Sequence, residues 1–172
     1  MKTNIIVRQT TEADYSIVYN LIKTAFETAE HRDGTEQDFA VDLRNGGNYL
    51  PELDLVAELD GHLAGHIMFT KTYVAQPDGS KYNVLMVAPL SVLLEYRNKG
   101  VGSTLMKEGF RIAEASGYGA ALLLGDPSYY QRFGYKPSYL YGIGHEIYPA
   151  EYLLAREIIS GALKDVTGTV NM

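Results

Sequence analysis

The chain has 172 residues, of which 46% are hydrophobic, and its formal net charge is −6. This length and hydrophobic content predict one folded domain over residues 1–172 and exclude an intrinsically disordered chain. The acidic balance argues against general nucleic-acid binding. The absence of cysteine excludes disulfides, thiolate metal sites and a thiol nucleophile.

No stretch approaches the ~20 apolar residues of a membrane span, and the N-terminus lacks the apolar run of a signal peptide. We therefore expect a soluble cytoplasmic protein with no membrane partner and no nucleic-acid partner. His31 and His145 lack the partner spacing of a metal site, so no metal is expected. The sequence leaves open whether the chain is a monomer or a homodimer.

The N-terminal part of the chain has the pattern of a strand followed by two helices. Residues 4–8 are typical of a strand, and residues 11–14 resemble a capping box that opens a helix. Apolar residues at helical spacing predict its buried face: Ile17, Val18, Leu21, Ile22 and Phe26. A second cap at residues 35–38 opens a short helix, in which Phe39 and Leu43 are expected to face the core. The intervening residues 27–34 are polar and acidic.

The middle of the chain predicts a meander of strands that leads into a helix. Strands are expected at residues 54–59 and 63–74, joined by Asp60-Gly61, a strong two-residue hairpin signal. After a turn at residues 77–79, the apolar run 85–94 predicts a buried strand. A helix opens at Gly100 and ends near Gly117, which suits the residue after a helix end.

The C-terminal part begins with a short apolar run at residues 120–124, which predicts a strand covered on both faces. Asp126 and Pro127 suit the start of a short helix over residues 128–133. Further along, residues 139–147 and 167–170 are interpreted as late strands, and residues 150–163 as a partly helical connection.

Between the strand at 85–94 and the following helix lies a basic turn, Arg97-Asn98-Lys99-Gly100-Val101-Gly102. The first N–H groups of a helix have no intrahelical partner, and the helix dipole adds positive charge there. Arg97 and Lys99 add full charges, and the glycines let an anion approach the backbone. The turn therefore predicts a phosphate site. It fits neither the P-loop nor the dinucleotide fingerprint, because the glycine spacing of both motifs is absent.

This turn resembles the acetyl-CoA motif [RQ]xxGx[GA] of the GNAT acetyltransferases. A second segment, GDPSYYQRFGY at residues 125–135, resembles the family's YxxxG[FY] motif through Tyr130, Gly134 and Tyr135. The order of predicted elements resembles the GNAT fold from end to end, and the late segments are closest to the YhbS-like branch of predicted N-acetyltransferases. The resemblance implies an α/β fold with a mixed, mostly antiparallel central sheet and helices on both of its faces.

The activity implied by the resemblance is transfer of acetyl from acetyl-CoA, the co-substrate, to a primary amine by direct attack in a ternary complex. Tyr130 is implied to be catalytic and to protonate the departing thiolate, with Tyr129 as the neighbouring alternative. The residues implied to bind acetyl-CoA lie at the strand end, through backbone groups, and in the turn: Leu90, Ser91, Val92, Arg97, Asn98, Lys99, Gly100, Val101, Gly102 and Ser103.

The motifs identify neither the acceptor amine nor the general base. Candidate bases are Glu30, His31, Glu36, Asp38, His66 and Glu95. The charged segment 27–37 and the acidic chain favour a cationic acceptor. Two alternatives remain: a non-catalytic acyl-CoA-binding module with the same fold, and a nucleotide-binding protein that uses the turn at 97–102.

Overall fold

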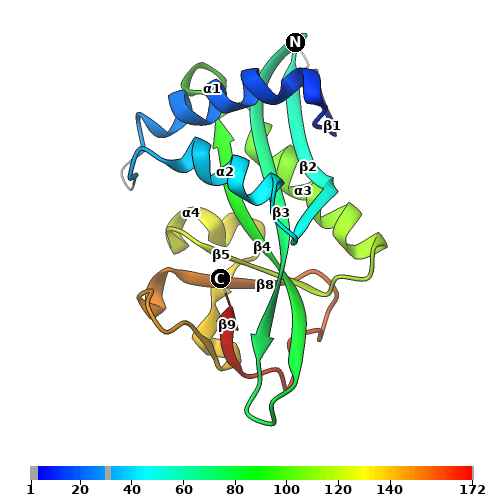
Figure 1. Cartoon of the computed structure of the whole chain (residues 1–172), viewed down its shortest axis with the longest axis vertical. Coiled ribbons are helices and arrows are strands. Elements are labelled where there is room, and N and C mark those ends of the chain that lie inside the picture. Colours follow the sequence, from blue (N-terminus) through cyan, green and yellow to red (C-terminus); the bar gives the residue numbers. More distant parts are fainter. Residues whose placement is uncertain (1–3, 30–31, 172) are drawn as a thin grey trace. The chain divides into compact units, whose positions relative to one another are not determined.

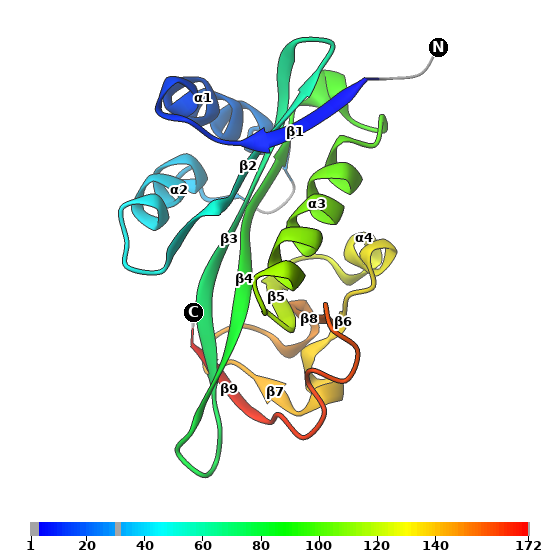
Figure 2. The same cartoon turned by 90° about the vertical axis from the view of Figure 1, so that its right-hand side faces the viewer.

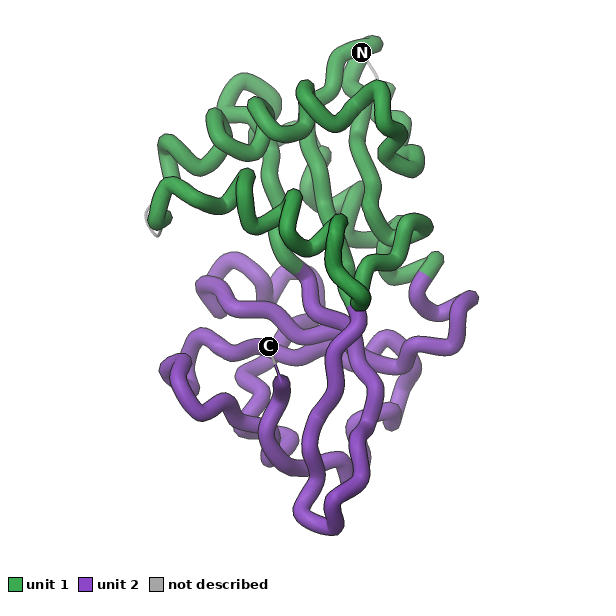
Figure 3. Tube along the Cα trace, in the orientation of Figure 1, with its two compact units in different colours: residues 1–70, 88–112 green, residues 71–87, 113–172 purple. Residues whose placement is uncertain are grey.

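The computed structural model describes residues 4–29 and 32–171. Within that part of the chain the fold is α/β, with a mixed and mostly antiparallel sheet and four α-helices (Figure 1). Residues 1–70 and 88–112 form one compact unit, and residues 71–87 and 113–172 form a second (Figure 3). Each unit is described by itself below.

The first unit packs helices on both faces of a twisted antiparallel sheet, as predicted (Figure 2). Helices α1 and α2 cover one face, and α3 covers the other. Strands β1, β2 and β3 pair antiparallel, and β4 is the next neighbour. The elements that contribute are β1 (Ile5–Gln9), α1 (Tyr15–Phe26), α2 (Glu36–Arg44), β2 (Tyr49–Leu59), β3 (His62–Ala75), β4 (Lys81–Val92) and α3 (Val101–Ala115).

The two helices α1 and α2 meet the sheet through a small apolar cluster of Val18, Ile22, Ala40 and Val56. Two predicted core residues are corrected here, because Ile17 is 53% exposed and Phe39 is 49% exposed. Successive helical residues are rotated by about 100°. The buried stripe of α1 follows Val18, so Ile17 falls on the outer face of the same helix.

Two local sequence signals are confirmed. Asp60 and Gly61 both have positive φ, 50° and 85°, as a tight hairpin turn between β2 and β3 requires. At the start of α1 the backbone N–H of Thr11 donates to Asp14 Oδ2 at 2.8 Å, which completes the capping box. Arg8 also donates to this carboxylate, with Nη1 at 2.7 Å from Oδ2, so the cap is tied to β1.

Helix α3 lies unusually close to the sheet because two glycines face it. A Cβ on Gly65 of β3 would lie 2.9 Å from Ser91 O and 2.9 Å from Val101 Cγ1. A Cβ on Gly109 of α3 would lie 2.3 Å from the fully buried ring of Phe69. These distances leave no room for a methyl group, so the seat of α3 on the sheet depends on both glycines.

The second unit is built around β5 (Ala120–Leu124), whose bounds match the prediction. It pairs parallel with β4, through Leu85↔Ala121 and Met86↔Leu122, and antiparallel with β8 (Leu153–Glu157). Strand β8 also pairs with β6 (Lys136–Pro137), while β9 (Gly168–Asn171) pairs with β3 and with β7 (Ile143–Gly144). The short helix α4 (Pro127–Tyr130) follows β5, and Asp126 caps it by accepting from Ser128 N at 2.9 Å.

One prediction for the C-terminal region is wrong and another holds only in part. Residues 139–147 are not one strand, because Ser138–Tyr141 form a 3₁₀ turn and only Ile143–Gly144 pair. In the connection 150–163, which was predicted to be partly helical, Ala150–Tyr152 form a 3₁₀ turn, but β8 occupies Leu153–Glu157. Pairing of β8 with the buried strand β5 satisfies its backbone, and this tertiary contact outweighs the local helical pattern.

We predict that Gly65→Ala destabilises the protein by about 1–3 kcal/mol, because the added methyl meets a backbone oxygen and two α3 side chains in a packed core. Chemical unfolding followed by circular dichroism measures the change. The matched control is Gly47→Ala, whose Cβ meets nothing within 4 Å and which should be neutral or slightly stabilising. Equal stability of the two variants would contradict the close seat of α3.

Candidate functional site

The glycine turn lies between the end of β4 and the start of α3. A 3₁₀ turn at Leu94–Tyr96 precedes it, and Asn98 and Gly100 have φ of 62° and 86°. Thr104 N donates to Gly100 O at 3.0 Å, so the α3 hydrogen-bond ladder begins at Thr104. The N–H groups of the three preceding residues therefore have no intrahelical acceptor. The exposed surface of the turn carries Asn98, Lys99 and Gly100.

The last residues of β4 present a further set of backbone groups. Leu90 and Val92 are half-buried and Ser91 is buried. Pairing with β5 involves Leu85 and Met86, and the strand continues beyond them to Val92. The Ser91 hydroxyl is buried and has no hydrogen-bond partner among the described residues.

The side chain of Arg97 is used differently from that of Lys99. Its Nε donates to Val92 O at 3.0 Å, and its Nη2 donates to Ala25 O at 2.9 Å. One guanidinium thus joins the end of β4 to the last turn of α1. The Lys99 side chain is exposed.

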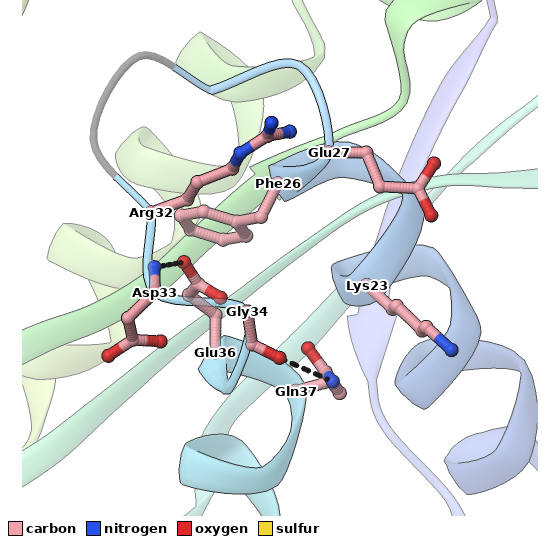
Figure 4. A pocket seen from close by; sticks show the side chains of 8 residues that line it. All are labelled: Lys23, Phe26, Glu27, Arg32, Asp33, Gly34, Glu36 and Gln37. Atoms are coloured by element: carbon pink, nitrogen blue, oxygen red, sulfur yellow. Dashed lines mark hydrogen bonds between the residues drawn. The ribbon is translucent and has the colours of Figure 1, made fainter.

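A cavity of ≈ 380 Å³ opens between the end of α1 and the start of α2 (Figure 4). Its lining mixes charged groups of both signs with one aromatic ring: Lys23, Phe26, Glu27, Arg32, Asp33, Gly34, Glu36 and Gln37. Three carboxylates and two cations give the lining a formal charge of −1 (−3 + 2). Most of these residues belong to the charged segment 27–37, on which the expectation of a cationic acceptor rests.

The side chain of Glu36, the first residue of α2, is held by the loop that precedes it. Its Oε1 accepts from Asp33 N at 2.9 Å, whereas its Oε2 is buried and has no hydrogen-bond partner in the described part of the chain (Figure 4). The Thr35 hydroxyl donates to Asp33 and lowers the pKa of that carboxyl, which stays ionised at neutral pH. A buried carboxylate oxygen without a donor suits an N–H donor on a ligand.

The candidate bases lie in different environments, and they differ in whether they line the cavity. Glu36 lines the cavity, while Asp38 accepts a 2.7 Å hydrogen bond from Tyr19 on the exposed side of α2. Glu95 is exposed in the 3₁₀ turn. Glu30 and His31 lie outside the described residues. Among the candidates that the structure describes, Glu36 is therefore the one that a cavity ligand reaches.

The remaining candidate, His66, is fully buried in a polar network under α2. Its Nε2 lies 2.7 Å from Asp54 Oδ1, and Asp54 Oδ2 accepts from Tyr49 at 2.7 Å and from Arg44 Nε at 3.0 Å. Burial raises the pKa of the Asp54 carboxyl, but the hydrogen bonds from His66, Tyr49 and Arg44 outweigh it and hold that pKa below its ordinary value. Asp54 is therefore an anion that accepts the Nε2 hydrogen, and His66 acts as a structural donor.

Tyr130 lies in the second unit, on α4 directly after β5. Its ring packs over Gly125, where a Cβ would lie 2.5 Å from Tyr130 Cε2, and edge-to-face with Tyr129 at 4.9 Å between centroids. Burial raises the pKa of Tyr130, and Tyr129 adds to this effect, so the phenol keeps its proton at neutral pH. The Tyr129 ring instead faces Arg132, whose Cζ lies 4.4 Å from the ring centroid.

Sequence reasoning missed two features of the first unit. The bond from Arg97 to Ala25 spans 72 positions, and the Asp54–His66 pair depends on the register of β2 against β3. Neither has a local signal in the sequence.

The described residues hold no group of three His, Cys, Asp or Glu side chains arranged for a metal ion. Within the same residues, no helix has the length and apolar character that crossing a membrane requires.

Comparisons with known proteins agree on one family. Residues 6–138 match the family described as acetyltransferase (GNAT) domain. The uncharacterized N-acetyltransferase YjhQ of Escherichia coli K12 is 33% identical over 132 residues, which cover 76% of this chain and 70% of YjhQ. The uncharacterized N-acetyltransferase YhbS of the same strain is 33% identical over 117 residues, which cover 67% of this chain and 64% of YhbS.

Two solved structures match nearly the whole chain. The Escherichia coli YhbS structure in complex with CoA has a TM-score of 0.85 and 28% identity, covering 98% of this chain and 89% of that one. A GNAT family acetyltransferase from Brucella melitensis in complex with acetyl-CoA has a TM-score of 0.79 and 25% identity, covering 98% and 96%.

Proposed function

Because the chain belongs to the GNAT acetyltransferase family, we propose that it binds acetyl-CoA and transfers the acetyl group to the amine of a cationic acceptor. The observation that carries the proposal is the turn at 97–103, which combines first-turn N–H groups that have no intrahelical acceptor, a lysine and two glycines. Relatives of similar fold have been solved with CoA and with acetyl-CoA, which supports this choice of ligand.

The turn fits a pyrophosphate on physical grounds. Backbone N–H groups of Val101, Gly102 and Ser103 precede the hydrogen-bond ladder, and they carry the positive end of the α3 dipole. Lys99 adds a mobile cation, and Gly100 takes up a backbone conformation that few other residues tolerate. In this proposal Leu90, Ser91 and Val92 bind the pantetheine arm through their backbone groups, as neighbouring strands bind one another.

The proposed reaction is direct attack of the neutral amine on the thioester carbonyl. The new C–N bond forms, the C–S bond breaks, the attacking nitrogen releases one proton to water, and the thiolate of CoA leaves and takes up one proton. A covalent acetyl-cysteine is excluded because the chain has no cysteine. Tyr130 is the proposed donor to the thiolate sulfur. Its raised pKa lies above the ~8.5 of a thiol, so stabilisation by a hydrogen bond contributes more than complete proton transfer.

The proposed acceptor site is the α1–α2 cavity. Its net negative lining attracts a cation, and Glu36 Oε2 is a buried acceptor that an ammonium or amine N–H satisfies. Phe26 supplies an apolar wall for the carbon chain that carries the amine. A polyamine-like or lysine-like amine has this combination of charge and alkyl chain.

We predict that acetyl-CoA at 100 times its Kd stabilises the protein by about 2.7 kcal/mol, which raises Tm by several degrees. In Ser103→Glu this shift should vanish, because a carboxylate in the first turn repels the pyrophosphate. The same carboxylate favours the unliganded helix. Ser103→Gln, of nearly equal size, is the control and should retain part of the shift. Thermal unfolding with and without ligand measures this, and an unchanged shift in Ser103→Glu would place the phosphates elsewhere.

We predict that a screen of amines finds acetylation of cationic acceptors, and that Glu36→Gln raises their KM by about tenfold or more through loss of a charge-assisted hydrogen bond. Asp42→Asn removes the same charge from an exposed position on α2 outside the cavity and should leave KM unchanged. Activity confined to neutral or anionic acceptors would contradict the acceptor class. Binding of acetyl-CoA without transfer to any amine would favour a binding module instead.

We predict that Tyr130→Phe lowers the single-turnover rate by about 10²-fold, near the lower end of general-acid effects, while acetyl-CoA affinity is retained. The substitution removes only the hydroxyl and leaves the ring over Gly125. Tyr129→Phe is the matched control and should keep most of the rate. Equal rates for Tyr130→Phe and the unmodified protein would identify Tyr130 as a packing residue.

A further inference from the structure

Arg97 links two parts of the first unit that the proposed reaction uses separately. Its Nε donates to Val92 O, the last residue of β4, and its Nη2 donates to Ala25 O in the last turn of α1. The residues that follow Ala25, Phe26 and Glu27, line the α1–α2 cavity. One planar guanidinium therefore bonds both the end of β4 and the turn of α1 that leads into the cavity wall.

The bond to Ala25 matches what the end of α1 requires. The last carbonyls of a helix lack intrahelical partners, and the end of the helix dipole favours a cation. Ala25 O accepts from Arg97 at 2.9 Å and from the Thr28 hydroxyl at 3.2 Å. Arg97 thus bonds the last turn of α1 at the point where the cavity segment begins.

We propose that Arg97 is a positioning residue that couples the two substrate sites: acetyl-CoA on the glycine turn fixes Arg97, and Arg97 fixes the α1 end of the acceptor cavity. The inference rests on the proposed function, because it takes the turn as the acetyl-CoA site and the cavity as the acceptor site. Coupling between two ligands is reciprocal, so each substrate binds more tightly when the other is present.

The geometry requires arginine for this role. Nε and Nη2 lie in one rigid plane, so a single side chain holds two carbonyls from different elements at fixed separation. A lysine at position 97 keeps the positive charge near the turn but has a single nitrogen, so it loses at least one of the two bonds. Arg97→Lys therefore removes the double hydrogen bond to Val92 and Ala25 while it keeps the positive charge.

The first experiment measures acetyl-CoA affinity by calorimetry and acceptor KM at saturating acetyl-CoA. For Arg97→Lys we expect an acetyl-CoA Kd within about twofold of the unmodified protein and an acceptor KM raised about 5- to 20-fold, within the usual range of coupling between sites. Lys99→Gln removes a cation from the same turn without touching this double hydrogen bond, and we expect it to weaken acetyl-CoA and leave acceptor KM unchanged. The opposite result, with Arg97→Lys weakening acetyl-CoA as Lys99→Gln does, would make Arg97 a phosphate ligand and overturn the proposal.

The second experiment needs no acceptor. Residue-resolved amide exchange is compared with and without CoA, and binding should slow exchange of the Glu27 and Ala29 amides, which donate to Thr24 O and Phe26 O. In Arg97→Lys this slowing should disappear while CoA still binds. If CoA binds and these amides are unaffected in the unmodified protein, the coupling is wrong and the proposed function stands. If CoA does not bind at all, the proposed function fails first.

Discussion

The close packing of α3 against the sheet is the constraint on which the rest of the first unit depends. Gly65 lets Val101 and Leu105 approach β3, and Gly109 accommodates the Phe69 ring. A larger residue at either position would lift the helix from the strands. The first turn of α3 then moves away from the end of β4, and the backbone groups that the proposal assigns to acetyl-CoA no longer share one edge.

On the other face of this unit α1 packs through apolar residues, whereas α2 depends more on polar contacts. Helix α1 buries four apolar residues, Val18, Leu21, Ile22 and Ala25, whereas Ala40 is the buried apolar residue that α2 contributes. The anchor of α2 is Arg44, which bonds Asp54 and stacks 4.2 Å from the Tyr15 ring centroid. The Asp54 carboxylate does not transfer a proton to a substrate, because Arg44 balances its charge and it is hydrogen-bonded to His66 and Tyr49. This buried network explains why a histidine in the middle of a GNAT sheet is a structural group.

Local signals in the sequence predicted local features well. Asp60-Gly61 fixes a turn by its own φ preferences, Asp126 caps α4, and the apolar run at β5 has the predicted ends. The strand–turn–helix structure around residues 97–102 was predictable for the same reason, because strand, glycines and helix are contiguous. These features depend on residues within a few positions of one another, so they can be inferred from the local sequence.

Features that depend on long-range pairing were not predictable. The local pattern at Leu153–Glu157 predicts part of a helical connection, but in the fold this segment pairs with β5 as a strand. The partner of His66 depends on the register of β2 against β3, and the bond from Arg97 to Ala25 depends on the position of α1. The same limit applies to the cavity between α1 and α2: the charged segment 27–37 is visible in the sequence, but the buried Glu36 oxygen is not.

In the proposed function, the first-turn N–H groups of α3 bind the pyrophosphate of CoA. Residue-resolved amide exchange of Gly102 and Ser103, measured with and without CoA, tests it most directly, and Thr104 serves as internal reference because its N–H already donates to Gly100 O. We expect strong slowing of exchange at Gly102 and Ser103 on binding, well beyond any change at Thr104. Bound CoA with unchanged exchange at Gly102 and Ser103 would contradict it.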